Sequence, residues 1–202
     1  LWILHSCLIF LCMETNKIKV KLEAPMVQAR YQYAIDVMLT RLRMIDADLT
    51  EKNERPLIRN LCSRIKTAES IVKKLERKER EVTFETAVNT LNDIAGVRVV
   101  CYFADDIYQI ADAVRRQKDF TIVKEKNYIR KPKKSGYQSL HLIVEIAIPF
   151  QKENQWIKLE LQLRHGLLGR IRFPDVLQKG RRAVRSGREG NKAVRRRHCG
   201  CG

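Results

Sequence analysis

The sequence lacks an apolar run long enough to cross a bilayer, because its longest one, residues 1–12, falls short of the ~20 residues that a membrane-spanning helix needs. That stretch also lacks the basic start and the small-residue cleavage site of a signal peptide. The six cysteines do not make a disulfide scaffold in a chain of 202 residues. These absences favour a globular, cytoplasmic protein.

Two cysteines, Cys62 and Cys101, lie among apolar residues, and we expect both to be buried as small apolar side chains. The C-terminal run from His198 to Cys201 contains one His and two Cys, which resembles a set of metal ligands. It lacks the second pair that a closed zinc site needs, so we do not predict zinc there.

Positive charge is abundant but unevenly placed. The chain holds 40 Lys and Arg against 23 Asp and Glu, a net charge of +17, and residues 165–202 alone hold 11 basic and 2 acidic residues. A basic protein attracts polyanions such as nucleotides, nucleic acids or acidic surfaces. We therefore predict a moderately basic domain followed by a very basic tail.

Periodicity and composition divide the chain into four segments. Residues 1–12 are interpreted as upstream sequence in front of a natural start at Met13, with a hydrophobic leader as the alternative. Residues 13–54 are predicted to be helical, since apolar residues recur at three- and four-residue steps. Residues 55–164 form the predicted domain. Residues 165–202 hold seven of the nine glycines and no regular period, which predicts disorder.

Within the predicted domain, hydrophobic patterning alternates between strand and helix periods. Strands are expected over residues 57–65, 96–103, 121–129, 140–148 and 157–164, helices over 67–78, 84–91 and 105–118, and a turn over 149–155. In the last strand, Ile157 begins a set of apolar residues that alternates with Lys158, Glu160, Gln162 and Arg164. A solvated outer face explains this pattern unless the strand is central, in which case the polar face must border a cleft.

The segment Lys131–His141 combines basic side chains, a glycine and an aromatic ring just before a strand. Phosphates favour the positive charge of Lys131, Lys133 and Lys134. Tyr137 offers a flat face on which a base can stack. A nucleotide site and a solvated basic loop both fit these residues.

Two carboxylates stand out by their context. Asp93 lies at a predicted helix–strand junction beside Gly96, and Glu160 lies on the polar face of the last strand. Mg²⁺ on a nucleotide takes one or two carboxylates plus phosphate oxygens. An acid pair among basic residues suits phosphoryl-group transfer. Spacing alone does not bring the two acids together.

Three motifs occur in order: Asp93-Ile-Ala-Gly-Val-Arg98, Ser135-Gly-Tyr-Gln-Ser-Leu-His141 and Leu159-Glu-Leu-Gln-Leu-Arg164. Together they resemble the synthetase domain of the RelA/SpoT alarmone synthetases, most closely the small, synthetase-only members. The resemblance covers residues 35–164. It implies an α+β fold, in which a mixed β-sheet flanked by helices is related to that of nucleotidyltransferases.

The resemblance also implies an activity, the transfer of diphosphate from ATP to the 3′-hydroxyl of GDP or GTP. The products would be ppGpp or pppGpp, the alarmones of the stringent response, and AMP. Mg²⁺ is the implied cofactor. The implied assembly is a homotetramer built through C-terminal helices, and regulation by RNA or by an alarmone stays open.

Motif positions assign expected roles to ten residues. Asp93 and Glu160 are expected to be catalytic and to bind Mg²⁺, with Glu160 also activating the 3′-hydroxyl. ATP is expected to meet Arg64, Lys66, Lys74 and Arg98. The guanosine nucleotide is expected to meet Tyr137, Lys133, His141 and Gln162, with guanine stacked on Tyr137 and phosphates held by Lys133 and His141.

Three features depart from the family pattern. Gln138 stands where the family usually has Arg, and Ser63 replaces a common Gly. After Arg164 the family continues with a Met-Asp-Phe-Trp-Ala-like helix start, which is missing here. If residues 165–202 are a frameshift product, the domain is C-terminally incomplete, and we expect weak or no activity from this polypeptide.

Two other functions remain open from the sequence. A non-catalytic nucleotide- or RNA-binding module would use the basic loop and tail without needing the acid pair. A nucleotidyltransferase acting on another acceptor would share the metal site but not the guanine platform. Replacing Asp93 separates the first from the synthetase, and offering other acceptors separates the second.

The frameshift hypothesis predicts the underlying DNA. Residues 165–169 back-translate as CAT GGA CTT CTG GGC, and reading one base further along gives Met-Asp-Phe-Trp-Ala. We expect sequencing across codons 160–185 to show these shifted codons. Their absence from the shifted frame removes the hypothesis.

Overall fold

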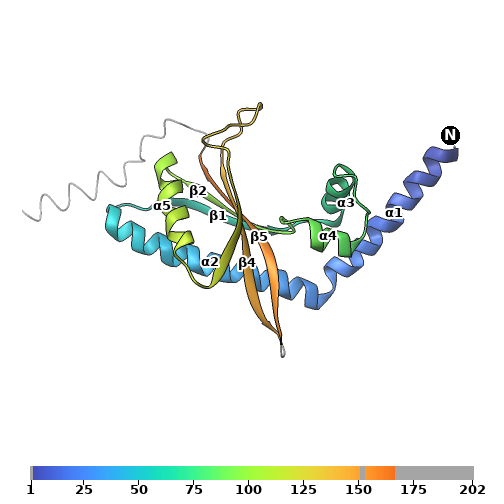
Figure 1. Cartoon of the computed structure of the whole chain (residues 1–202), viewed down its shortest axis with the longest axis horizontal. Helices are drawn as coiled ribbons and strands as arrows, with labels where there is room; N and C mark the ends of the chain where they lie inside the picture. Colours follow the sequence, from blue (N-terminus) through green and yellow to red (C-terminus); the bar gives the residue numbers. More distant parts are fainter. Residues whose placement is uncertain (1, 151–152, 167–202) are drawn as a thin grey trace, which may run out of the picture. The chain divides into compact units, whose positions relative to one another are not determined.

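The computed structural model describes residues 2–150 and 153–166, so the predicted tail and its His/Cys run lie outside the described residues. In chain order the elements are α1 (Trp2–Glu23), α2 (Pro25–Asn53), β1 (Ile58–Ile65), α3 (Ala68–Glu76), α4 (Phe84–Thr90), β2 (Ala95–Cys101), α5 (Ala104–Arg115), β3 (Phe120–Asn127), β4 (Leu140–Phe150) and β5 (Glu153–His165) (Figure 1). Every predicted strand and helix is present, with small shifts at the ends.

The strands form one five-stranded sheet in the order β1-β2-β5-β4-β3. The β2–β5 pair is parallel, and the other three pairs are antiparallel. A mixed sheet with helices confirms the predicted α+β class. The last strand of the sequence is central, so its polar side chains lie in the middle of the sheet.

One face of the sheet is buried by α2 and α5, which pack against each other and against β2 and β5 (Figure 1). Strand alternation sends every second side chain to this face. Thus Leu159, Leu161 and Leu163 are fully buried, while Glu160 and Gln162 belong to the opposite face. The polar face of β5 is therefore held in place by an apolar core directly behind it.

The long helix α2 follows the apolar period seen in the sequence. Pro25 occupies its first turn, where a missing N–H costs nothing. Its buried residues recur at three- and four-residue steps: Tyr31, Ala34, Ile35, Met38, Leu42, Ile45 and Leu49. The helices α1, α3 and α4 form a second group, in which α3 and α4 pack on α1.

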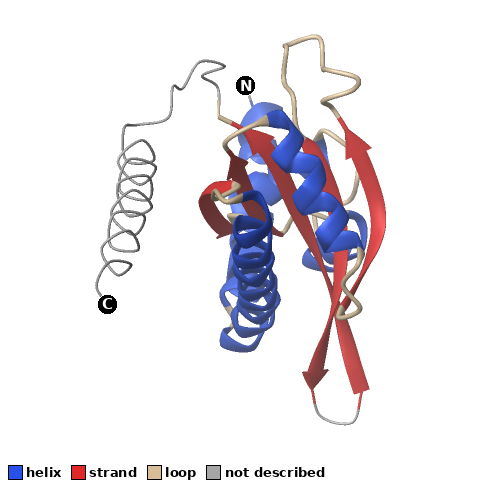
Figure 2. Ribbon diagram, turned by 90° about the vertical axis from the view of Figure 1, so that its left-hand side faces the viewer, coloured by secondary structure: helices blue, strands red, loops and turns tan. Residues whose placement is uncertain are grey.

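The hairpin between β4 and β5 differs from the prediction. Instead of a turn over residues 149–155, the strands stay paired as far as Phe150 and Glu153, so that the hairpin projects past the rest of the sheet (Figure 2). Strand β3 pairs with β4 only up to Ile146. Pro149 therefore lies where one side of β4 has no partner strand, a position that tolerates a residue without an N–H.

The prediction for Cys62 is also wrong. Cys101 is buried as expected, but Cys62 is exposed on β1. Strand β1 is an edge strand whose burial pattern shows no buried residue. Its apolar neighbour Leu61 points to the other face, because adjacent strand residues face opposite sides.

Both edge strands are irregular. The register shifts between Ile58 and Asn60 in β1, and again between Ile122 and Lys124 in β3. Such bulges are common at sheet edges, where they increase the local twist.

At the N-terminus, α1 runs without a break past Met13, so the backbone shows no boundary at the end of residues 1–12. The assignment of those residues to a leader or to upstream sequence stays a prediction. Among the described residues, no helix offers an apolar stretch that could cross a membrane.

Two aspartates tie the connection between α2 and β1 to the rest of the domain. Asp46 on α2 accepts hydrogen bonds from the backbone N–H groups of Leu57 and Ile58, at 3.3 and 3.0 Å. Asp106 on α5 is fully buried and receives both terminal nitrogens of Arg55, at 2.5 and 3.1 Å. These contacts fix where β1 begins.

We expect Asp106→Asn to lower the free energy of unfolding by roughly 2 kcal/mol, because Arg55 loses a charged, bidentate partner. The neighbouring Asp105 is exposed, so Asp105→Asn is the matched control and should change stability by less than about 0.5 kcal/mol. Urea unfolding followed by circular dichroism measures both. Equal stability of the two variants would show that the Arg55 pair does not anchor this connection.

Candidate active site on the open face of the sheet

A row of side chains crosses all five strands on the face opposite the core. Strand pairing aligns Cys62 of β1 with Arg98 of β2, Arg98 with Gln162 of β5, Gln162 with His141 of β4, and His141 with Lys126 of β3. Paired residues in adjacent strands point to the same side of a sheet. Three predicted site residues from three sequence motifs therefore become neighbours.

The next row carries Glu160, one of the two carboxylates predicted to be catalytic. Arg64 pairs with Gly96, and Gly96 pairs with Glu160. Because Gly96 has no side chain, the space between Arg64 and Glu160 stays open. An open cleft of about 470 Å³ lies here, and it is lined by Cys62, Ser63, Arg64, Asp93, Gly96, Val97, Arg98, Glu160 and Gln162.

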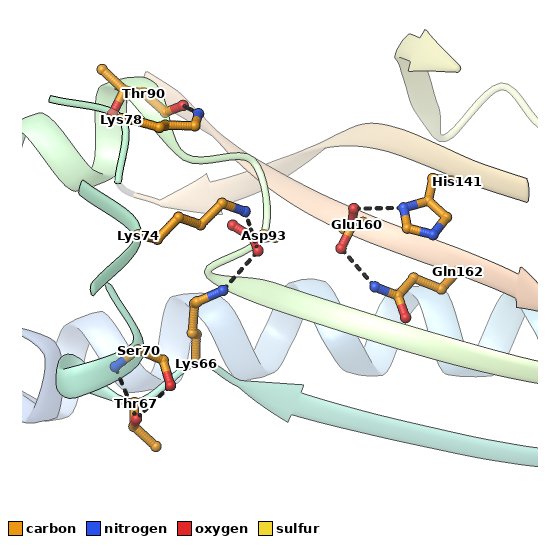
Figure 3. Close-up of polar contacts among 10 residues, drawn as sticks. All are labelled: Lys66, Thr67, Ser70, Lys74, Lys78, Thr90, Asp93, His141, Glu160 and Gln162. Carbon is orange, nitrogen blue, oxygen red and sulfur yellow. Dashed lines mark hydrogen bonds and ion pairs between the residues drawn. The ribbon is translucent and has the colours of Figure 1, made fainter. Parts of the chain in front are cut away.

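Asp93 lies just before β2 and is held by two lysines. Its Oδ2 accepts hydrogen bonds from Lys66 Nζ at 2.8 Å and from Lys74 Nζ at 2.5 Å (Figure 3). Burial raises the pKa of Asp93, but the two ammonium groups outweigh it and hold the pKa below its ordinary value. The carboxyl group is therefore ionised at neutral pH.

Glu160 is held through both of its carboxylate oxygens. His141 Nδ1 lies 2.9 Å from Oε1, and Gln162 Nε2 donates to Oε2 at 2.8 Å (Figure 3). Burial raises the pKa of Glu160, yet the hydrogen bonds from His141 and Gln162 bring it below its ordinary value. The negative charge of Asp93 acts in the opposite direction and raises the pKa of Glu160, but by less than the hydrogen bonds lower it.

The pair fits a divalent cation. Asp93 Oδ1 is buried and has no hydrogen-bond partner among the described residues. A buried carboxylate oxygen without a donor is costly unless a cation or water satisfies it. No cluster of three or more His, Cys, Asp or Glu occurs in the described part of the chain, so the remaining ligands of such a cation would come from phosphates and water.

Beyond the Glu160 side of the cleft lies the segment Lys131–His141, a loop that leads into the first residues of β4. Gly136 has a φ of 74°, a left-handed conformation that suits glycine, and its N–H donates to the carbonyl of Lys133 at 2.8 Å. Lys133 Nζ lies 4.6 Å from the ring centre of Tyr128 and 5.2 Å from that of Tyr137. The loop thus places a cation beside two aromatic rings.

The structure brings most of the predicted residues together. Arg64, Asp93, Arg98, Glu160 and Gln162 line one cleft. His141 contacts Glu160, and Tyr137 contacts His141. Lys66 and Lys74 reach the site through Asp93.

Sequence reasoning missed two members of the row across the sheet, Cys62 and Lys126. Residues two apart in a strand point to the same side of the sheet. Cys62 therefore faces the same side as Arg64, two residues further on, and Lys126 faces the same side as Lys124, two residues before it. Alternation alone gives a face for each strand, but only the register shows that these faces meet.

The mixed α+β domain thus carries an acid pair and several cations on one open face, an arrangement whose chemistry suits phosphorylated ligands. Residues 63–167 match the region found in RelA / SpoT proteins, about half of the chain. This chain belongs to the RelA/SpoT family.

Curated and solved relatives agree with this assignment. The chain is 38% identical over 134 residues to the GTP pyrophosphokinase YwaC of Bacillus subtilis, a match that spans 66% of this chain and 64% of the relative. The crystal structure of small alarmone synthetase 2 from Bacillus subtilis is similar with a TM-score of 0.58 and 37% identity, over 68% of this chain and 69% of the other. Small alarmone synthetase 1 from the same organism, bound to its product pppGpp, has a TM-score of 0.61 and 31% identity, over 67% and 70%.

The two cysteines in the described strands should react very differently with iodoacetamide. Burial raises the pKa of the Cys101 thiol to about 12, so it stays protonated near pH 8 and is shielded as well. We expect peptide mass spectrometry to show rapid labelling of exposed Cys62, and labelling of Cys101 only in denaturant.

The same experiment maps the cleft. A ligand that fills the cleft should slow the labelling of Cys62, which lines it, and ATP with Mg²⁺ is the first to test. Labelling of Cys101 at the rate of Cys62 in native protein would contradict the placement of these two side chains.

Proposed function

We propose that this chain transfers the β,γ-diphosphate of ATP to the 3′-hydroxyl of GDP or GTP, which gives ppGpp or pppGpp and AMP. The observation that carries the proposal is the position of Asp93 and Glu160 in one cleft, between Arg64 and Arg98 on one side and His141 and Tyr137 on the other. The residues expected for each nucleotide therefore flank the acid pair. The names of the relatives support the same reaction.

The chemistry requires one bond to form and one to break. The 3′-oxygen of the guanosine nucleotide bonds to the β-phosphorus of ATP, and the bond from that phosphorus to the bridging oxygen of the α-phosphate breaks to release AMP. The proton of the 3′-hydroxyl goes to Glu160, which is ionised at neutral pH because its pKa lies below its ordinary value.

Mg²⁺ held by Asp93 and Glu160, when bound, would neutralise charge on the transferred diphosphate. Asp93 is suited to this role because its buried Oδ1 has no partner among the described residues. Arg64 and Arg98 provide planar cations that stack on adenine or pair with phosphate.

Lys66 and Lys74 add two ammonium groups next to Asp93. In the state described here they neutralise the aspartate, and phosphate oxygens would offer them a second anionic partner. On the other side of Glu160, Tyr137 is the expected guanine platform and Lys133 the expected phosphate contact. Cytoplasmic location, tetrameric assembly and regulation by RNA or an alarmone stay predictions.

We expect Asp93→Asn and Glu160→Gln each to lower the rate of alarmone synthesis at least ~100-fold, because one removes a metal ligand and the other the proton acceptor. The assay supplies ATP, GDP or GTP, and Mg²⁺, and measures AMP and the alarmone by ion-exchange chromatography. Asp105→Asn, a charge change on the exposed end of α5, is the matched control and should retain activity.

Undiminished synthesis by Asp93→Asn would contradict the proposed metal site. Tight nucleotide binding without AMP release in the unmodified chain would instead favour a non-catalytic nucleotide-binding module. Product formed only with other acceptors would favour a different nucleotidyltransferase.

A further inference from the structure

His141 has both ring nitrogens occupied by protein partners. Nδ1 lies 2.9 Å from Glu160 Oε1, and Nε2 lies 3.0 Å from the hydroxyl of Tyr137. The His141 side chain is only 11% exposed. A phosphate contact at Nε2, as the family resemblance implied, would require the Tyr137 hydroxyl to leave this nitrogen.

The charge on Glu160 sets the direction of these hydrogen bonds. An ionised carboxylate only accepts, so the Nδ1 nitrogen of His141 must carry the proton that points to Oε1. In neutral imidazole the other nitrogen then accepts, and the hydroxyl of Tyr137 donates to Nε2. The three side chains form a directed chain from Tyr137 through His141 to Glu160.

Packing keeps the imidazole in this orientation. The ring of Tyr128 meets it edge to face with centroids 5.3 Å apart, and the ring of Tyr137 does so at 5.9 Å. Strand pairing places His141 directly opposite Gln162, which donates to the other oxygen of Glu160. The carboxylate is therefore held through both of its oxygens, by His141 of β4 and by Gln162 of its own strand.

We propose that His141 is a positioning residue that links the guanine platform to the catalytic carboxylate. The proposal deepens the function proposed above and rests on it only for the kinetic consequences. Stacking of guanine on Tyr137 would fix the phenol ring, the phenol would fix the tautomer of His141, and His141 would aim Glu160 Oε1. A guanosine nucleotide would in this way align the group that takes its own 3′-hydroxyl proton.

Tyr137→Phe tests this link, because it keeps the stacking face and removes only the hydroxyl. We expect kcat to fall roughly 3- to 10-fold, the value of one neutral hydrogen bond, while the KM for GDP changes less than about 2-fold. Tyr128→Phe is the matched control, since it removes a hydroxyl from the other ring packed on His141, and it should leave kcat unchanged. A raised KM with unchanged kcat in Tyr137→Phe would overturn the proposal, because the hydroxyl would then act on the nucleotide.

Two substitutions of His141 separate positioning from phosphate binding. The amide nitrogen of Asn replaces Nδ1, and that of Gln replaces Nε2. If His141 positions Glu160, His141→Asn retains more activity than His141→Gln, by about 10-fold or more in kcat. If His141→Gln instead retains more activity than His141→Asn, and the weaker variant has a raised KM, His141 binds a phosphate and the proposal is overturned.

A spectroscopic measurement separates failure of the link from failure of the proposed activity. The chain has four histidines, so ¹⁵N spectra of selectively labelled protein can be assigned by comparison with His141→Asn. We expect a protonated Nδ1 and a bare Nε2 for His141 without any nucleotide, and a shift of Nε2 in Tyr137→Phe but not in Tyr128→Phe. A proton on Nε2 in the unmodified chain would overturn the proposal whether or not the chain makes an alarmone.

Discussion

The parallel pairing of β2 with β5 is the constraint on which the site depends. Among the strands that the structure describes it is the one parallel pair, and its register places Gly96 beside Glu160. Asp93, three residues before Gly96, thereby reaches the same cleft. A shift of this register by one residue would turn the polar side chains of β5 toward the core, so the apolar face of β5 also protects the register.

The apolar core on one side of the sheet holds the polar side chains on the other side in fixed positions. Leu159, Leu161 and Leu163 are fully buried against α2 and α5, which leaves β5 little freedom to tilt or slide. The backbone positions of Glu160 and Gln162 are fixed in the same way, because both residues belong to β5. Catalytic groups on a rigid strand keep their alignment better than groups on a loop.

The element order and the polar face of β5 could be predicted from the sequence, because both depend on local periodicity. The α+β class was implied by the family resemblance. The neighbours of Asp93 could not be predicted in this way. Lys66 follows β1 and its backbone N–H donates to the carbonyl of Ile94 at 2.7 Å, whereas Lys74 lies on α3. Both reach Asp93 only in the folded chain, which no local pattern encodes. The prediction for Cys62 was wrong for a related reason. The side chains of an edge strand are not fully covered on either face of the sheet, so apolar neighbours in the sequence do not imply burial there.

The two edges of the sheet limit how this domain can associate. Strand β1 exposes Arg59, Asn60 and Arg64, strand β3 exposes Lys124 and Lys126, and each edge carries a bulge. Charged and irregular edges resist the addition of further strands. The two edges therefore disfavour assembly by extension of the sheet from one molecule to the next.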